Sequence, residues 1–364
     1  MVFNFTVVKK DSTSGARLGR LITAHGTVET PAFMPVGTQG SVKALSPRDL
    51  EEMGCQMILA NTYHLYLRPG VEVIRDLGGL HRFMGWNRPI LTDSGGYQVF
   101  SLGALRKITE EGARFQSHLD GSSHLLTPEK VVQIQEDLGS DISMVLDECI
   151  PHPSSREYVK ASTARTVRWA ERSLKARKKS DQALFGIIQG GMYEDLRAEC
   201  ARELTPIPFD GFAVGGLGVG EGEATLNSIG AFTAGLLPEN RPRYLMGVGR
   251  PEDLIFAVRS GYDLFDCVLP TRNARTGTLF TSRGKINIKR AEFSKDARPV
   301  DESCDCYCCR HFSRAYLRHL YHAGEILAAQ LNTIHNVHFY HRLMDKFRQL
   351  IREDRAGEEL DTVL

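Results

Sequence analysis

The sequence lacks both a long hydrophobic run and a net charge of either sign. No stretch approaches the roughly 18 apolar residues of a membrane helix, so we expect no membrane span. Residues 1–6 show no basic segment followed by an apolar one, which favours a soluble, cytoplasmic protein over a secreted one. Lysine and arginine number 45 and aspartate and glutamate 44, so a nucleic-acid site must be a local basic patch.

Cysteine is sparse outside one segment, and its distribution argues against a disulfide framework. Four of the eight cysteines fall within residues 304–309. Such a density is typical of a metal site in a reducing compartment. The hydrophobic content of 42% supports a sizeable core, and 364 residues suffice for one large domain with an appendage or for two domains.

Periodic segments predict an α/β fold built on a parallel barrel. Residues 1–30 alternate apolar and polar positions and indicate antiparallel strands that cap the barrel. The eight strands predicted after them are 32–36, 57–61, 89–93, 142–147, 184–189, 211–215, 243–247 and 264–268. Because these strands alternate with helical segments, they predict a closed (β/α)8 TIM barrel, whose reactive groups lie at the C-terminal strand ends.

Helix signals separate the strands. Ser46 and Thr127 are each followed by a proline, which is typical of a helix start. Further helices are predicted over 155–179, 194–204, 224–236 and 251–260. The segment 313–353 is apolar at helical spacing with a bend at Gly324, and the charged end after Arg352 is expected to fray.

Polar residues stand at the ends of successive predicted strands. Asp93, Asp147, Gln189 and Asp266 each occupy such a position, and Gly216 follows the sixth strand. Each has a structural alternative on its own. Asp93 could cap the turn that follows it, and Asp266 could pair with a nearby arginine. Together they favour an active site, since random placement rarely puts polar groups at the same end of so many strands.

The segment 270–298 is basic. It contains eight basic residues and two acidic ones, the basic ones being Arg272, Arg275, Arg283, Lys285, Lys289, Arg290, Lys295 and Arg298. Residues 278–281 and 285–288 flank a turn and predict a hairpin. Charged hairpins are often only solvated surfaces, but this one directly follows the strand with Asp266. A role in contacting phosphates is therefore the better interpretation.

The cysteine cluster predicts a structural zinc site. Cys304, Cys306 and Cys309 with one later histidine supply three thiolates and one imidazole, a closed tetrahedral set without a position for water. His335 is the predicted fourth ligand. Several residues are alternatives: His311, His322, His338, His341 and the thiol of Cys308. We expect residues 1–285 to form the catalytic barrel with its capping strands, and residues 286–364 a zinc-binding helical subdomain packed on the barrel.

These features resemble the bacterial type of tRNA-guanine transglycosylase over nearly the whole chain. The matching blocks are residues 93–98, 147–149, 189–190, 215–217, 244–249 and 265–272, and the cysteine cluster with His335. The resemblance implies exchange of the wobble guanine of tRNAs with G-U-N anticodons for 7-aminomethyl-7-deazaguanine, a step toward queuosine. It also implies one structural zinc ion per chain, the tRNA anticodon loop and a 7-deazaguanine base as partners, and a homodimer.

The resemblance also assigns roles to residues. Asp266 would be the nucleophile that forms a covalent bond to the ribose, and Asp93 would donate and accept the proton, as in retaining glycosidases. The base would contact Asp93, Tyr97, Asp147, Cys149, Gln189, Gly216, Leu217, Val219, Glu221 and Met246. In this set, Tyr97 and Met246 would sandwich the ring. The Leu217 carbonyl, backed by Glu221, would meet the aminomethyl group. Arg272, Arg275 and Lys285 would bind the RNA.

Three other functions compete with this reading. A non-catalytic RNA-binding relative would lack Asp266 or Asp93, and both are present. An O-glycoside hydrolase is disfavoured because only Trp86 and Trp169 are available to line a sugar cleft. Base exchange at another tRNA position, as in archaeal relatives, would require an appended RNA-binding domain, for which 364 residues leave little room.

Overall fold

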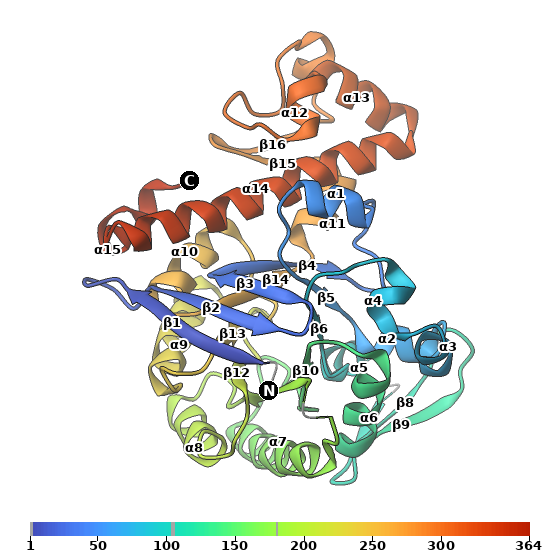
Figure 1. The fold of residues 1–364 in the computed structure, drawn as a ribbon, viewed down its shortest axis with the longest axis vertical. Helices are drawn as coiled ribbons and strands as arrows, with labels where there is room; N and C mark the ends of the chain where they lie inside the picture. Colours follow the sequence, from blue (N-terminus) through green and yellow to red (C-terminus); the bar gives the residue numbers. More distant parts are fainter. Residues whose placement is uncertain (1–2, 103–105, 180) are drawn as a thin grey trace.

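A closed barrel of eight parallel strands forms the centre of the molecule. The computed structural model describes residues 3–102, 106–179 and 181–364 (Figure 1). The barrel strands are β4 (Ala32–Gly37), β5 (Ile58–Ala60), β6 (Ile90–Thr92), β10 (Ile142–Met144), β11 (Ala183–Ile188), β12 (Gly211–Val214), β13 (Arg243–Leu245) and β14 (Leu264–Cys267). β14 pairs with β4 and closes the ring. The predicted TIM barrel and its eight strands are therefore confirmed.

Helices surround the barrel, and their starts follow the signals in the sequence. Ser46 and Asp49 form a capping box at α1 (Pro47–Glu52), and Thr127 caps α6 (Pro128–Leu138). The other helices around the barrel are α2 (Thr62–Leu67), α3 (Val71–Asp76), α4 (Gly79–Met84), α5 (Gly96–Ser101), α7 (Arg156–Ala176), α8 (Glu194–Leu204), α9 (Glu223–Leu236) and α10 (Pro251–Arg259). Their apolar faces pack on strands that are buried throughout except at Asp266 of β14, as in other parallel barrels.

An antiparallel sheet caps the N-terminal ends of the barrel strands. It consists of β1 (Asn4–Lys10), β2 (Arg17–Thr23) and β3 (Gly26–Thr30), as predicted for residues 1–30. Arg17 of β2 donates from Nε to Oδ1 of the buried Asp263 over 3.0 Å, and Asp263 directly precedes β14. The sheet is therefore fixed to the end of the barrel opposite the C-terminal strand ends.

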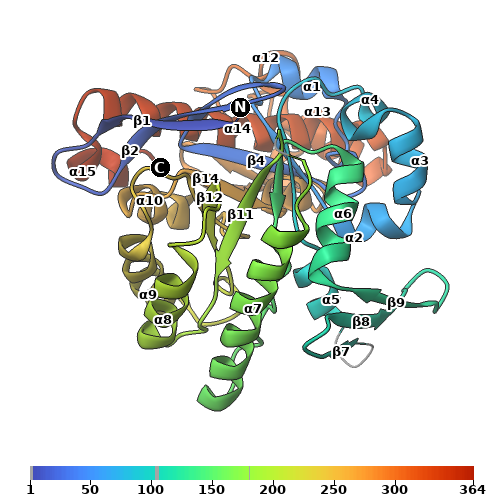
Figure 2. The same cartoon turned by 60° about the horizontal axis from the view of Figure 1, so that its bottom comes forward.

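A second antiparallel sheet was not predicted. It follows α5 and consists of β7 (Arg106–Ile108), β8 (Ala113–Gln116) and β9 (Ser123–Leu126), which stand beside the barrel (Figure 2). The strands are only three or four residues long, and β9 is only partly buried. Strands this short carry too few alternating residues for a periodic signal.

The C-terminal part is built around one long helix. After α11 (Leu269–Arg275) come the hairpin β15 (Thr278–Thr281) and β16 (Gly284–Asn287), the 3₁₀ turn Ala291–Lys295, α12 (Tyr307–His311), α13 (Arg314–Ala323) and α14 (Ile326–Arg352). Gly324 has φ +74° and ends α13, which confirms the predicted bend. α14 runs along the barrel, and the segment with the cysteine cluster, residues 304–309, lies on its far side (Figure 1). The predicted boundary, residue 285, lies within β16. The two-domain division stays a prediction.

The prediction that the end of the chain frays is wrong. Residues beyond Arg352 form α15 (Ala356–Glu359) and a 3₁₀ turn over Leu360–Thr362. The amide of Ala356 donates to Oδ2 of Asp11 over 3.0 Å, and Leu360 is buried in the barrel core. These apolar residues stabilise the segment despite its charged neighbours. In the described part of the chain, every helix is too short or too polar to cross a membrane.

Candidate active site

A cavity of about 540 Å³ opens at the C-terminal ends of the barrel strands. It brings together residues from the ends of all eight barrel strands, which are far apart in the sequence. The predicted residues that line it are Asp93, Tyr97, Asp147, Cys149, Gln189, Gly216, Leu217, Val219, Met246, Asp266 and Arg272. Of the residues predicted to contact the base, only Glu221 is outside this lining.

One carboxylate oxygen of Asp266 accepts hydrogen bonds from the protein, and the other accepts none from the described residues. Its Oδ1 accepts hydrogen bonds from the hydroxyl of Tyr244 over 2.6 Å and from the amide of Gly247 over 2.8 Å. Among the described residues, none donates to Oδ2, and no arginine forms an ion pair with Asp266. Burial raises the pKa of Asp266, although the bonds from Tyr244 and Gly247 oppose this effect. The geometry thus leaves one oriented oxygen available to a molecule in the cavity.

Asp93 is fixed by hydrogen bonds to both oxygens. Oδ1 accepts from the amides of Thr62 over 2.8 Å and Gly95 over 3.2 Å, and Oδ2 accepts from Nδ2 of Asn61 over 2.5 Å. The bond from Gly95 confirms that Asp93 caps the turn that follows it. This cap involves Oδ1 and not Oδ2. Burial raises the pKa of Asp93 to about 6, and the negative charge of Asp266 adds to this rise. Such a carboxyl group can change protonation state near neutral pH.

Asp147 and Gln189 form a buried polar pair beside two glycines. Nε2 of Gln189 donates to Oδ2 of Asp147 over 2.7 Å, and burial raises the pKa of Asp147 to about 6. Oε1 of Gln189 is buried and has no hydrogen-bond partner in the described structure. A Cβ at Gly216 would lie 2.5 Å from this atom, and Gly216 has φ +69°. Glycine is needed here for the backbone to approach the amide side chain.

The remaining residues predicted to contact the base lie at the rim of the cavity or behind the loop that follows β12. The ring of Tyr97 is 58% exposed, and Tyr97 and Met246 both line the cavity. Glu221 instead accepts hydrogen bonds from the amides of Gly218 over 2.6 Å and Val219 over 2.9 Å. It therefore holds the loop from its outer side and faces a neighbouring hollow.

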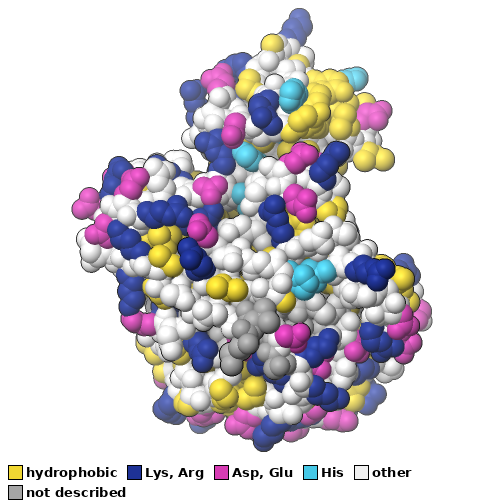
Figure 3. All heavy atoms as spheres, viewed as in Figure 1, with side chains coloured by type: hydrophobic (Ala, Val, Ile, Leu, Met, Phe, Trp, Pro, Cys, Tyr) yellow, Lys and Arg dark blue, Asp and Glu magenta, His cyan; other side chains and the backbone are white. Residues whose placement is uncertain are grey.

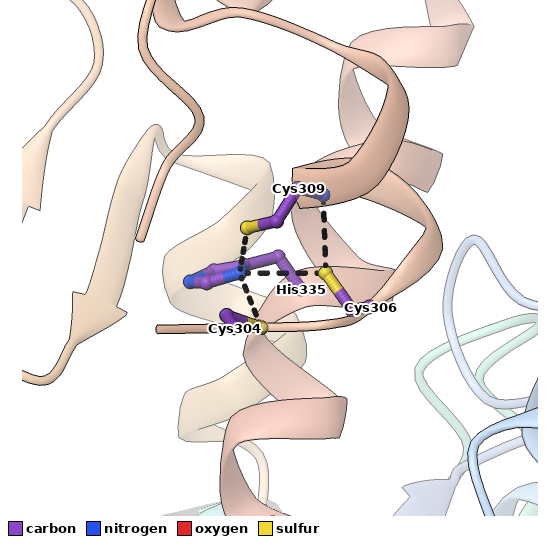
Figure 4. A group of neighbouring side chains, drawn as sticks. All are labelled: Cys304, Cys306, Cys309 and His335. Atoms are coloured by element: carbon purple, nitrogen blue, oxygen red, sulfur yellow. Dashed lines mark hydrogen bonds between the residues drawn. The ribbon is translucent and has the colours of Figure 1, made fainter. Parts of the chain in front are cut away.

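Three cysteines and one histidine converge in the C-terminal part (Figure 4). Nδ1 of His335 lies 3.7 Å from Sγ of both Cys304 and Cys306 and 3.3 Å from Sγ of Cys309. A tetrahedral zinc ion with bonds of about 2.0 Å to nitrogen and 2.3 Å to sulfur separates these atoms by about 3.5 Å. Nε2 of His335 bonds to the Phe280 carbonyl over 2.6 Å, which leaves Nδ1 free to bind a metal.

The structure also decides between the alternative ligands. Cys308 is fully buried among apolar residues and is not a member of the cluster. His338 groups only with Cys304 and Asp305 and bonds to the latter, and His322 bonds to the Lys289 carbonyl. Among the described residues, His311 and His341 are in no group that could hold a metal. The donor set therefore fits one metal ion and consists of the four predicted residues.

Known proteins resemble this chain over nearly its whole length. The family model described as Queuine tRNA-ribosyltransferase matches residues 11–364. The queuine tRNA-ribosyltransferase of Solidesulfovibrio magneticus is 60% identical over 342 residues, or 93% of this chain and 92% of the relative. Those of a Thermoanaerobacter species and of Listeria innocua are 59% and 56% identical, each over 97% of this chain and over 95% and 94% of their own lengths. The chain belongs to this family.

Membership in the queuine tRNA-ribosyltransferase family confirms the resemblance that the motifs indicated. The predicted enzyme class, a transferase of pentosyl groups, is confirmed with it. The three residues predicted to bind RNA lie at different places in and around the cavity. Arg272 lines the cavity, whereas Arg275 is exposed on α11 and donates from Nε to the Thr271 carbonyl over 3.0 Å. Lys285 lies on β16, with Nζ 3.9 Å from Oε1 of Glu252.

Sequence reasoning missed three residues of this family member's cavity whose side chains donate to the carboxylates, namely Asn61, Ser94 and Tyr244. Asn61, which bonds to Asp93, ends the second predicted strand and had the same positional signal as the predicted residues. Tyr244, which bonds to Asp266, lies inside the seventh strand and is 1% exposed. Its sequence position does not distinguish it from a core tyrosine.

Proposed function

We propose that this enzyme exchanges the wobble guanine of tRNAs with G-U-N anticodons for 7-aminomethyl-7-deazaguanine, in queuosine biosynthesis. The observation that carries the proposal is the pair Asp266 and Asp93. One carboxylate has an unpaired oxygen at the cavity, and the other has a pKa raised to about 6. Retaining exchange at a sugar needs this combination of a nucleophile and an acid/base group.

The reaction runs through two displacements. Oδ2 of Asp266 attacks the anomeric carbon of the ribose, the bond to guanine breaks, and protonated Asp93 gives its proton to the departing base. The intermediate is an ester between Asp266 and the ribose. Asp93 then takes the N9 proton of the incoming deazaguanine, whose nitrogen attacks the same carbon and releases the carboxylate of Asp266. Two inversions restore the configuration of the sugar.

The base is recognised by groups that complement its polar edge. Guanine presents N–H donors beside a carbonyl acceptor. Asp147 supplies an acceptor, Gln189 an amide and Gly216 a backbone donor in the same cavity. The flat ring stacks between Tyr97 and Met246, while Cys149 and Val219 limit the space beyond it. The Leu217 carbonyl accepts from the aminomethyl group, and Glu221 holds that loop.

The anticodon loop binds at the cavity mouth. Arg272 and Arg275 follow Asp266 on α11 and contact the nucleotides beside the target, and Lys285 contacts the backbone. The target nucleotide must leave its stack before Asp266 can reach its sugar, as in other enzymes that act on a base. Arginine fits this position because its planar group both stacks on bases and donates paired hydrogen bonds.

The metal of Cys304, Cys306, Cys309 and His335 is one zinc ion. Three thiolates and one imidazole complete a tetrahedral site and leave no position for substrate, so the ion supports the fold and takes no part in the reaction. It fixes the segment that carries α12 to α14. The division into residues 1–285 and 286–364 and the cytoplasmic location remain part of this proposal.

The enzyme is proposed to act as a homodimer. Hydrophobic side chains gather on the surface over α12 and α13 (Figure 3). Tyr307 and Tyr316 are 48% and 39% exposed, and Phe312 packs between them with ring centroids 5.7 and 5.5 Å away. An exposed aromatic patch of this kind favours association with another protein surface. Sedimentation of the wild-type enzyme and of Tyr316→Glu tests the proposed dimer. We expect a dimer for the wild type and a monomer for Tyr316→Glu, and a monomeric wild type would contradict the proposal.

Base exchange is tested with radiolabelled guanine and unmodified tRNA carrying a G-U-N anticodon. We expect acid-precipitable label in this tRNA and none in a tRNA with adenine at the wobble position. Unlabelled 7-aminomethyl-7-deazaguanine should then displace incorporated label, and Asp266→Asn should incorporate none. Absence of label with the wild-type enzyme would overturn the proposed function.

A further inference from the structure

A second buried charge lies behind the cavity, and the mechanism above does not use it. Arg197, on α8, is 0% exposed, and no acidic side chain of the described residues forms an ion pair with it. Burial lowers the pKa of Arg197 to about 10, so its guanidinium remains charged at neutral pH. A buried cation without a carboxylate partner is costly, so the hydrogen bonds that its guanidinium makes must offset this cost.

The guanidinium of Arg197 bridges two loops of the active site. Nε donates to the carbonyl of Gly191 over 2.8 Å, and Nη2 donates to the carbonyl of Gly215 over 3.1 Å. The first loop follows β11 and the second follows β12. Nη1 is buried without a hydrogen-bond partner, so the bonds to Gly191 and Gly215 are the hydrogen bonds that this guanidinium makes in the described structure.

The fit between Arg197 and the first loop is tight. A Cβ at Gly190 would lie 2.6 Å from both the amide nitrogen and Cγ of Arg197, and Gly190 has φ +147°. The loop therefore rests directly on the arginine. Because glycine backbones have little intrinsic preference for one conformation, an external contact is needed to hold such a loop in place.

Both bridged carbonyls adjoin residues that face the base. Gly191 is two residues after Gln189, and Gly215 immediately precedes Gly216. The two loops also touch each other, since a Cβ at Gly215 would lie 2.6 Å from Nε2 of Gln189. A shift of either carbonyl would therefore change the distance between the Gln189 amide and the Gly216 backbone.

We propose that Arg197 is a positioning residue that sets the separation of Gln189 and Gly216 and thereby the affinity for the free base. This inference rests on the proposed binding of the base between these two groups. Arg197 does not contact the base itself. Its planar fork reaches two carbonyls on different loops at once, which a lysine ammonium on a flexible stem does not reproduce.

A matched control exists at the opposite end of the barrel. Arg243 is also buried, and its guanidinium likewise donates to two backbone carbonyls, those of Leu237 over 2.6 Å and Pro238 over 3.4 Å. Burial lowers the pKa of Arg243 to about 10, as for Arg197. The two arginines therefore have similar structural roles, but only Arg197 holds loops of the cavity.

The experiment compares Arg197→Met with Arg243→Met in the full-length enzyme. Both changes should lower the melting temperature. Only Arg197→Met should raise the KM for free guanine, by about tenfold or more, with the KM for tRNA within about twofold of wild type. An unchanged KM for guanine in Arg197→Met, or an equal rise in both variants, would overturn the inference.

Two further variants keep the result decisive. Arg197→Lys retains the charge and most of the stem, so it tests the bridge even where Arg197→Met does not fold; a wild-type KM for guanine in Arg197→Lys would refute the two-loop bridge. Gln189→Leu tests the base site itself. If the KM for guanine is raised in Gln189→Leu but equals the wild-type value in the Arg197 variants, only the positioning role is refuted. If the KM for guanine in Gln189→Leu also equals the wild-type value, the proposed base site is refuted.

Discussion

The hydroxyl of Tyr244 donates to Oδ1 of Asp266 over 2.6 Å, from the neighbouring barrel strand. This bond orients the carboxylate and stabilises its charged form, in opposition to the burial that raises the pKa of Asp266. A nucleophilic carboxylate must be ionised to attack the sugar. The strength of this one bond should therefore be visible in the pH dependence of the reaction.

Tyr244→Phe should raise the pKa of Asp266 and move the acidic limb of kcat to higher pH. The sign follows because the reactive form is the carboxylate, which is lost as pH falls through its pKa, and a higher pKa places that loss at higher pH. Tyr262→Phe is the control, since this buried tyrosine donates to the Gly230 carbonyl. An acidic limb that coincides for wild type and Tyr244→Phe would contradict the prediction.

Asp266→Asn should fold normally and lose base exchange. The amide cannot form the glycosyl ester, so the rate should fall below about one thousandth of wild type. A denaturant-resistant complex of enzyme and RNA should disappear as well, as judged on a denaturing gel. Near-native exchange together with a persistent adduct would show that another residue is the nucleophile.

Asp147→Asn should stabilise the fold at pH 7.5 and weaken base binding. Burial raises the pKa of Asp147 to about 6, so the folded state binds this proton more tightly than the unfolded state does. The contribution of this group to the free energy of unfolding therefore falls by about 1.4 kcal/mol per pH unit as pH rises from about 4 to about 6. Urea unfolding should show a gain of no more than about 3 kcal/mol at pH 7.5 and a smaller one at pH 5. An equal change in the free energy of unfolding at both pH values would contradict this prediction.

Cys306→Ser should lower the zinc content and the melting temperature together. Its thiolate belongs to the four-residue cluster, and loss of a structural metal removes folding free energy. Cys308→Ser is the matched control because Cys308 is equally buried but lies outside the cluster. Elemental analysis should find about one zinc per chain in wild type and in Cys308→Ser. A wild-type protein without zinc would refute the metal assignment.

Arg275→Ala should raise the KM for tRNA and leave the affinity for the free base nearly unchanged. Arg275 is exposed on α11, and its side chain bonds to the Thr271 carbonyl and to no other described residue, so its removal should leave Asp266 in place. Arg275→Lys should not restore the KM, because an ammonium lacks the planar fork. Arg202→Ala changes an exposed arginine on α8 and should have no effect. Weaker base binding with intact tRNA affinity would contradict RNA recognition by Arg275.

Much of the fold and of the site could be predicted because the signals are local. A buried strand reads as a short apolar run, and the polar residue that ends it marks the catalytic end of a parallel barrel. Asp93, Asp147, Gln189 and Asp266 were found in this way, and the structure places all four in one cavity. The cysteine spacing likewise indicates a metal site from the sequence alone.

Other features depend on contacts between distant segments, which no local pattern records. Ala356 is held by a hydrogen bond to Asp11, a residue 345 positions away in the sequence. The charged residues around Ala356 therefore wrongly predicted that this end of the chain frays. Cys309 rather than Cys308 joins the metal cluster because α12 turns one sulfur toward His335 and the other into the core.

The amino-acid sequence by itself determined the barrel, the carboxylates at the strand ends and the chemistry of the candidate metal ligands, since each follows from residue type and short-range spacing. Only the tertiary structure decided which atoms meet. Tyr244 and Arg197 look like ordinary core and helix residues in the sequence, yet one holds the carboxylate of Asp266 and the other bridges two loops. A hydrogen bond depends on distance and direction, and these are set only when the whole chain has packed.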